Sequence, residues 1–295
     1  TDSDSDTDTD TDTDTDTDTD TDTDTDTDTD TDTDTDTDTD TPGVLSIICK
    51  KESDHGAQYT SGRINSEFAV PNDPGTTAEA RVKMAAKRCS HADPFANGTW
   101  PAVWMLGGDS SEQGYGGGVA WPGCGEIDIN EWLGSDSNHY QTNQWGTPNF
   151  TVDHNSPAVV NYPAGGGPEE WHVYGVRFNG DTITYTFDGA DQATKTYDDA
   201  DSHTHRIILN MAIGGDMGGT IAGDFDEDMI QIDWVRVKDS GGNLLWSDEM
   251  DSETYTKANW FTFVGMAYNN EAQYYTNWEA DNFEWHTDLT RGECN

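Results

Sequence analysis

The sequence predicts an all-β sandwich for residues 42–295, and three observations support this fold class. Short runs of alternating apolar and polar residues recur along the region, as in Glu79–Met84. Turn dipeptides such as Asp188-Gly189 separate these runs. Long helical periodicity is absent, so we expect packed sheets to bury the core. About 255 residues are ample for one such domain.

The expected strands begin at the start of this region. Val44–Lys50 is an apolar run that predicts a strand. Further along, Trp171–Phe178 and Thr182–Phe187 flank Asn179-Gly180-Asp181, and this pattern predicts a hairpin.

Residues 1–41 form a low-complexity Thr-Asp repeat with two early Ser substitutions. The repeat has no apolar residue to bury and carries a negative charge at every second position, so alone it should be disordered and extended. Two interpretations stay open. One is an unmodified acidic linker, and the other is an O-glycosylated stalk or cation-binding spacer used in surface attachment or self-assembly.

The formal net charge of −44 restricts the partners of the protein. A surface this acidic repels phosphates, so we do not expect nucleic acid as a partner. Acidic polysaccharides are disfavoured for the same reason, and a neutral glucan fits better. No apolar run reaches the roughly 18 residues that predict a membrane span.

Several features suggest an extracellular, secreted protein. The chain begins at Thr1 rather than Met, which suggests a processed chain. Asn97 and Asn149 each begin an N-glycosylation sequon.

The cysteine count is even and compatible with two disulfide bonds in an oxidising compartment. Spacing does not fix the pairing. Cys89–Cys124 would brace the loop before the acidic strand described next, and Cys49–Cys294 would brace the ends of the domain.

The stretch Gly125–Trp132 holds three acids within six residues. Strand alternation places Glu126 and Asp128 on one face and Glu131 on the other. A β-bulge would return Glu131 to the face of the other two acids. Two carboxyls could then flank a glycosidic bond as nucleophile and proton donor, while the third tunes their protonation states. The alternative is a polar outer face of a surface strand.

The motif Glu-Ile-Asp-Ile-x-Glu at residues 126–131 resembles the catalytic strand of glycoside hydrolase family 16. The form with the extra residue is typical of laminarinases, which are endo-1,3-β-glucanases, and of 1,3-1,4-β-glucanases. Further segments resemble the family in its order: Tyr59–Ile64, Gly98–Gly107, Trp121–Gly125, Ile208–Gly215 and Ile232–Val237. The resemblance implies a concanavalin A-like jelly-roll sandwich with a glycan cleft on its concave face.

The resemblance also implies roles for individual residues. Glu126 would be the nucleophile, Glu131 the general acid/base and Asp128 their tuning partner. The residues expected to bind substrate are Arg63, Asn65, Trp100, Trp104, Trp121, His139, Gln144 and Asn269. Tryptophans stack on the apolar faces of sugar rings. Gln144 stands where the family usually has a histidine, which leaves the exact glucan linkage open.

No cofactor is expected for catalysis, but family 16 often carries a structural Ca²⁺. The resemblance places its side-chain ligands at Asp233 and Glu249 and a backbone carbonyl ligand at Gly75. Oxygen ligands from distant segments suit Ca²⁺. Ordinary exposed acids are the alternative.

Residues 244–295 resemble the usual N-terminal part of a family 16 domain, although they follow its final strand. Leu244–Asp251 and Asn269–Thr276 carry this likeness. We interpret it as a circular permutation, which is inexpensive because the termini of a sandwich lie near each other. A truncated second domain and a strand exchanged between subunits are the alternatives.

Together these features predict a retaining endo-β-glucanase that hydrolyses β-1,3 or mixed 1,3-1,4 glucan. The alternative function is an extracellular glycan-binding or fibril protein, with the Thr-Asp repeat as a glycosylated assembly element.

Overall fold

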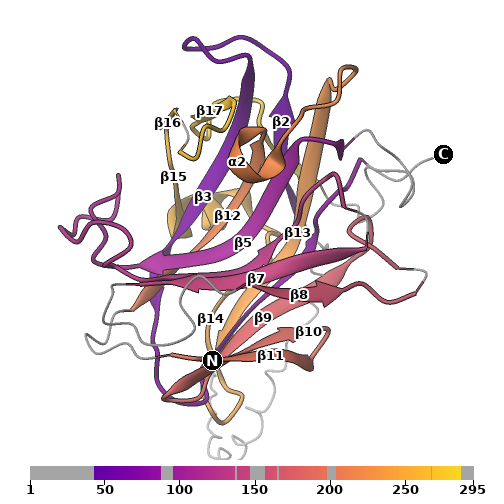
Figure 1. Ribbon diagram of the computed structural model, residues 1–295. Helices are drawn as coiled ribbons and strands as arrows, with labels where there is room; N and C mark the ends of the chain where they lie inside the picture. Colours follow the sequence, from indigo (N-terminus) through magenta and orange to yellow (C-terminus); the bar gives the residue numbers. More distant parts are fainter. Residues whose placement is uncertain are drawn as a thin grey trace, which may run out of the picture. The chain divides into compact units, whose positions relative to one another are not determined.

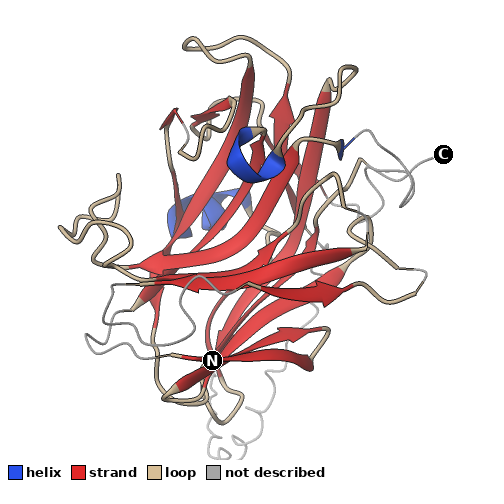
Figure 2. Ribbon diagram, viewed as in Figure 1, coloured by secondary structure: helices blue, strands red, loops and turns tan. Residues whose placement is uncertain are grey.

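The computed structural model describes residues 43–87, 96–136, 138–146, 157–164, 166–197, 204–266 and 268–286. Strands are the main regular structure of the described chain, as Figure 2 shows, and its two helices, α2 (Gly215–Gly218) and α3 (Glu253–Asn259), are short. The predicted all-β fold is therefore confirmed. The Thr-Asp repeat lies outside the described residues.

The described strands form two sheets that share β3, and the order of pairings closes on itself as in a barrel (Figure 1). The first, called here the site sheet, contains in spatial order β15 (Trp260–Thr262), β3 (Tyr59–Val70), β12 (His205–Ile213), β5 (Thr99–Gly107), β6 (Glu126–Glu131), β7 (His139–Trp145) and β8 (Ala158–Asn161). Every pairing in it is antiparallel, so its strands alternate between a face on the core and a face outside it.

The second sheet, called here the back sheet, is also mainly antiparallel. In order it contains β11 (Ala190–Thr196), β10 (Thr182–Phe187), β9 (His172–Phe178), β4 (Thr77–Lys83), β13 (Glu227–Lys238), β2 (Val44–Lys50) and β18 (Phe283–His286). The predicted hairpin is the pair β9 and β10. The first half of β3 joins this sheet through β2 and pairs in parallel with β17 (Gln273–Thr276), which in turn pairs with β16 (Gly265–Met266).

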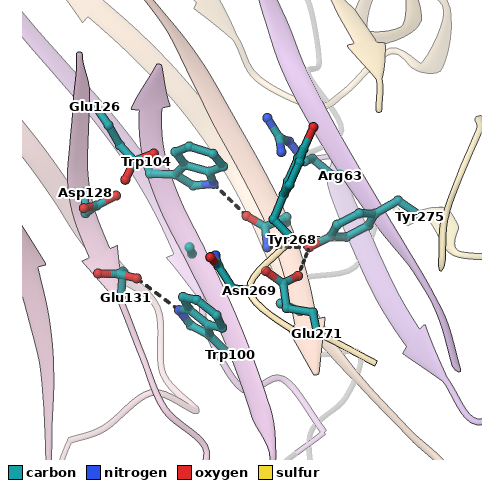
Figure 3. Close-up of a pocket in the computed structure, with 13 residues that line it drawn as sticks. Arg63, Trp100, Trp104, Glu126, Asp128, Glu131, Tyr268, Asn269, Glu271 and Tyr275 are labelled. Atoms are coloured by element: carbon teal, nitrogen blue, oxygen red, sulfur yellow. Dashed lines mark hydrogen bonds between the residues drawn. The ribbon is translucent and has the colours of Figure 1, made fainter. Parts of the chain in front are cut away.

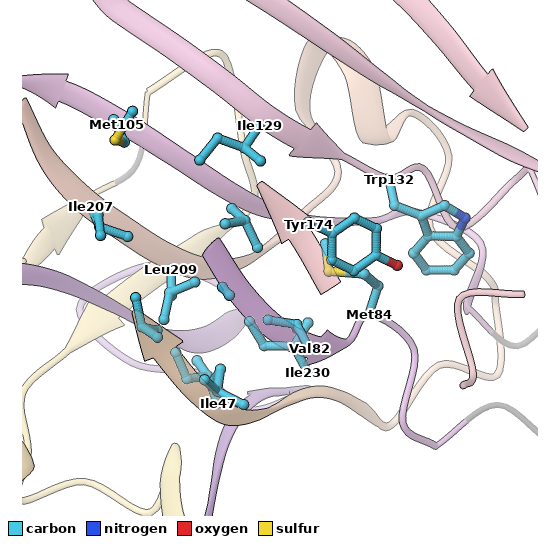
Figure 4. Close-up of a cluster of buried hydrophobic side chains, with 14 of the residues drawn as sticks. Ile47, Val82, Met84, Met105, Ile129, Trp132, Tyr174, Ile207, Leu209 and Ile230 are labelled. Atoms are coloured by element: carbon cyan, nitrogen blue, oxygen red, sulfur yellow. The ribbon is translucent and has the colours of Figure 1, made fainter. Parts of the chain in front are cut away.

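The core lies between the two sheets (Figure 4). In β6 the alternation sends Ile127 and Ile129 inward, and in β12 it sends Ile207 and Leu209 inward. The back sheet contributes Ile47, Val82, Tyr174 and Ile230 to the same cluster. Apolar burial on one face of the site sheet therefore turns its polar residues to the other face.

Residues 244–266 and 268–286 pack on their own chain. β14 (Leu244–Asp248) pairs with β13, β15 and β17 pair with β3, and β18 pairs with β2. The side chains of Met250, Trp260 and Phe283 join the core cluster. Asp248 of β14 accepts hydrogen bonds from Thr256 Oγ1 of α3 at 3.0 Å and from Trp260 Nε1 of β15 at 2.9 Å. These bonds hold α3 against β14. Docking on a neighbouring chain is therefore unnecessary, while circular permutation stays a prediction.

The structure describes one cysteine of each expected disulfide bond, and neither of these two cysteines is bonded. Cys49 and Cys124 are free and fully buried, and Cys89 and Cys294 lie outside the described residues. Burial raises the pKa of both thiols, to about 11 at Cys124. Each thiol behaves as a small apolar side chain in its sheet.

No helix in the described ranges is long and apolar enough to cross a membrane. Of the two sequon asparagines, Asn97 is half-buried and its carbonyl accepts a hydrogen bond from the backbone of Ala222 at 2.9 Å. Asn149 lies outside the described residues. Glycosylation stays a prediction.

Candidate active site

The predicted β-bulge lies in β6. Across the β5–β6 pairing, Ala102 is opposite Glu131 and Trp104 is opposite Asp128, so three residues of β5 span four of β6. This extra residue turns Glu131 to the face that carries Glu126 and Asp128. All three acids line one pocket on the outer face of the site sheet.

The pocket has a volume of about 510 Å³. Figure 3 shows the three acids along one wall and the side chains of Arg63, Tyr268, Glu271 and Tyr275 along the other. The complete lining is Arg63, Trp100, Ala102, Trp104, Glu126, Asp128, Glu131, Asn210, Ala212, Tyr268, Asn269, Glu271 and Tyr275. A second hollow of about 860 Å³ shares Glu126 and Trp104 with it and continues past Ser111, Glu112 and Trp121. The two hollows together form an elongated cleft.

One row of residues across the site sheet explains how distant segments meet here. Arg63 of β3 is opposite Asn210 of β12, which is opposite Ala102 of β5, which is opposite Glu131 of β6. Directly opposite residues point to the same face of a sheet. The small Ala102 side chain leaves the space in which the pocket forms.

Two predicted tryptophans line the pocket through polar as well as apolar contacts. Trp100 Nε1 donates a hydrogen bond to Glu131 Oε1 at 3.1 Å. Trp104 Nε1 donates to Asn210 Oδ1 at 2.7 Å. Each indole is therefore fixed at its nitrogen in the wall of the pocket.

Burial sets the protonation of the acids. Desolvation raises the pKa of Glu126 to about 8, with further increases from Glu131 and Glu112 and decreases from Arg63 and Trp121. Desolvation and the two neighbouring glutamates hold the pKa of Asp128 well above its usual range. Desolvation also raises the pKa of Glu131 to about 7. Near neutral pH the group can therefore hold a protonated carboxyl beside an ionised one.

Arg63 is the cation that lines this pocket. Its Nη2 donates to Glu112 Oε2 at 2.6 Å, and its guanidinium lies 4.8 Å from the ring centres of both Trp104 and Phe263. Asn65 also points to this face, but it is completely buried and its Oδ1 accepts a bond from Arg63 Nε at 3.2 Å. The prediction that Asn65 contacts substrate is therefore wrong. Asn65 instead holds the side chain of Arg63 in place.

Trp121 and Asn269 lie at the cleft as predicted. Trp121 is 50% exposed and lines the second hollow beside Glu126. Asn269 lines both hollows and has a φ of 54°, in the left-handed region that asparagine tolerates. His139 lies beside Glu131 in a smaller adjoining hollow, where its Nε2 is 2.7 Å from Asp136 Oδ2.

The predicted cleft position of Gln144 is wrong. Gln144 is opposite Ile127, whose side chain faces the core, and its Nε2 donates to the backbone carbonyl of Thr196 at 2.5 Å. The residue opposite Glu131, beyond the bulge, is Gln141. A histidine-for-glutamine difference at residue 144 therefore says little about the glucan linkage.

The two carboxylates predicted to bind calcium form ion pairs with arginines instead. Asp233 contacts Arg81, and Glu249 accepts two bonds from Arg236 at 3.0 and 2.6 Å. Within the part of the chain that the structure describes, no three or more His, Cys, Asp and Glu residues come together as a metal site. A side chain at Gly75 would collide with Ser240. The carboxylates are neutralised by protein cations, so the geometry gives no support to a calcium site.

Besides two alanines, sequence reasoning missed four residues of the pocket that carry polar groups, namely Asn210, Tyr268, Glu271 and Tyr275. Asn210 had a usable signal, because it is a polar residue within the apolar run Ile207–Ile213. The other three lie in the C-terminal segment, and only its docking beside β3 and β12 brings them to the acids.

The chain is similar to known glycan hydrolases. A family model described as Glycosyl hydrolases family 16 matches residues 18–236. Glucan endo-1,3-beta-glucosidase A1 of Niallia circulans is 30% identical over 203 residues, which cover 61% of this chain and 26% of that protein. Beta-glucanase of Rhodothermus marinus is 28% identical over 210 residues, which cover 66% of this chain and 68% of that protein. The chain thus spans about a quarter of the first relative and two thirds of the second.

A similar fold is known in complex with a glycan. A variant of LamA from Zobellia galactanivorans, solved with laminaritriose and laminaritetraose, aligns with a TM-score of 0.54 and 29% identity. The alignment covers 66% of this chain and 77% of that one.

Proposed function

Since the chain belongs to the glycosyl hydrolases of family 16, we propose that it is a retaining endo-β-glucanase acting on β-1,3 or mixed 1,3-1,4 glucan. One observation carries this proposal. Three acids with raised pKa values share one face of a bulged strand inside an elongated cleft. Enzymes of this family need no catalytic cofactor.

Each acid has a role in the proposed reaction. Glu131 donates its proton to the glycosidic oxygen while the carboxylate of Glu126 attacks the anomeric carbon and forms a glycosyl-enzyme ester. Glu131, now ionised, takes a proton from the water that cleaves this ester. Arg63 and the Trp121 hydrogen bond both oppose the increase in the pKa of Glu126 that burial causes. Asp128 lies between the two glutamates in the strand, and their charges add to the burial that holds its pKa well above its usual range.

The proposed substrate follows from the cleft and from the relatives. The cleft continues from the main pocket into the second hollow, so a chain can bind through several sugar rings. Indole faces suit the apolar faces of glucose. The acidic lining and the net charge of −44 favour a neutral polysaccharide. The relatives described as endo-1,3-β-glucosidase and β-glucanase support a β-glucan.

The test compares the hydrolysis of laminarin by wild type and by Glu126→Gln. The matched control is Glu279→Gln, because Glu279 is an exposed residue of the C-terminal segment. We expect Glu126→Gln to lower reducing-end release by several orders of magnitude, since the nucleophilic step has no substitute. The control should match wild type. Proton NMR of early wild-type products should show the β-anomer first. An initial α-anomer, or near-normal turnover in Glu126→Gln, would contradict the proposal.

The alternative of a protein that only binds glycans or forms fibrils is less favoured, because a binding surface does not need three acids of raised pKa in one pocket. Extracellular location, attachment or assembly through residues 1–41, and the permuted order of segments are further parts of the proposal.

A further inference from the structure

A fourth carboxyl group, that of Glu271, lies on the wall opposite the three acids. It belongs to the turn between β16 and β17, where its backbone forms a bridge with Gly214 and its N–H donates to the carbonyl of Tyr268 at 3.0 Å. Figure 3 shows its side chain pointing to the pocket beside Asn269, across from Glu131.

A hydrogen-bond relay holds this carboxyl in place. Glu271 Oε2 accepts bonds from Gln273 Nε2 at 2.6 Å and from Tyr275 OH at 3.2 Å. Tyr275 OH in turn accepts from Asn210 Nδ2 at 3.0 Å, and Asn210 accepts from Trp104. The relay therefore connects the C-terminal segment with the wall that carries the acids. Both anchoring donors bind the same oxygen of Glu271, so the carboxyl is oriented before any ligand arrives.

A purely structural role does not explain why this residue is an acid. Burial raises the pKa of Glu271, with smaller decreases from Gln273, Tyr275, Arg63 and Asn269. A glutamine could accept the same two bonds without placing a fourth carboxyl in a pocket that already holds three. An oriented carboxylate at the wall of a cleft is a strong acceptor for hydroxyl groups, because hydrogen bonds to charged groups exceed those between neutral groups.

We infer that Glu271 is a substrate-binding residue, whose carboxylate accepts hydrogen bonds from hydroxyl groups of a glucose ring lying between the two walls. The inference rests on the proposed function and deepens it. A carboxylate recognises hydroxyl groups and repels sulfate or carboxylate substituents, so Glu271 also selects an unsubstituted neutral glucan.

The first test is steady-state kinetics of Glu271→Ala and Glu271→Gln on laminarin, with Glu279→Gln as the exposed control from the same segment. We expect KM to rise about ten- to hundredfold in Glu271→Ala, which corresponds to the loss of hydrogen bonds to a charged group. Glu271→Gln keeps an acceptor and should raise KM about three- to tenfold. In both variants kcat should stay within about threefold of wild type, because the reacting acids are untouched.

The second test measures binding without hydrolysis. Laminaritetraose is titrated calorimetrically into Glu126→Gln and into the Glu126→Gln/Glu271→Gln double variant, and we expect Kd to rise in the double variant by the same factor as KM. This comparison separates the two proposals, since binding is measured whether or not Glu126 is the nucleophile. An unchanged Kd overturns the role of Glu271, as does a fall in kcat at unchanged KM. Near-isosteric Glu271→Gln keeps the test valid if Glu271→Ala fails to fold.

Discussion

The two walls of the cleft are built in different ways. The wall that carries Glu126, Asp128 and Glu131 is one hairpin of neighbouring strands, β5 and β6, with a single bulge. The opposite wall combines Arg63 of β3, Asn210 of β12 and a loop from the last fifty residues. The first wall is specified almost completely by local sequence, and the second exists only after distant segments have docked.

This difference matches the proposed roles of the two walls, which are catalysis for the first and substrate binding for the second. Reacting groups need fixed mutual geometry, which neighbouring positions on one strand provide directly. Recognition of a polymer needs contacts spread over several rings, which distant segments can supply. Substitutions on the first wall should therefore act mainly on kcat, and substitutions on the second mainly on KM.

The largest expected effect comes from removing most of the second wall. Truncation after Val237 deletes Trp260, Phe263, Tyr275 and Phe283, all buried. At roughly 1.5–3 kcal/mol for each fully buried large side chain, the loss is comparable to the usual net stability of about 5–15 kcal/mol. We expect neither cooperative unfolding, measured by circular dichroism, nor laminarin hydrolysis. A soluble, active fragment would show that the second wall is dispensable.

A moderate effect is expected from neutralising one acid of the first wall. Burial raises the pKa of Glu126 from 4.5 to about 8 in the folded protein, so the folded state holds a proton that the unfolded state releases between these values. Stability is therefore lost as pH rises from about 4.5 to about 8. Glu126→Gln does not titrate, so its free energy of unfolding should exceed that of wild type by about 1–3 kcal/mol at pH 8 and by little at pH 4.

Urea unfolding at the two pH values measures this difference, and Glu279→Gln should follow wild type at both. A Glu126→Gln variant less stable than wild type at pH 8 would show that the carboxyl stabilises the first wall.

The smallest effect is expected from deleting residues 1–41, which have no apolar side chain to bury. We expect kcat, KM and the unfolding midpoint of the deletion variant to match those of the full chain. Loss of surface attachment or assembly at unchanged turnover would support a spacer role, whereas a large loss of stability would contradict it.

The sequence was most informative where neighbouring residues interact. The spacing of Glu126, Asp128 and Glu131 was sufficient to predict the bulge, because no regular strand places all three acids on one face. Gln144 was misplaced because its face is set by its pairing with the core-facing Ile127, and a resemblance between sequences does not give that pairing. Glu271 was missed because its position beside Gly214 depends on docking of the C-terminal segment, which alternation does not reveal.

The two buried thiols of Cys49 and Cys124 allow local unfolding of each sheet to be measured by chemical labelling. Cys124 lies immediately before β6 in the site sheet, and Cys49 lies within β2 of the back sheet, each with no exposed surface and a raised pKa. Alkylating reagents attack the thiolate, so each residue reacts only when its surroundings open to water. Mass-spectrometric labelling rates at the two positions would therefore report separately on local unfolding at the acid-bearing strand and at the layer behind it.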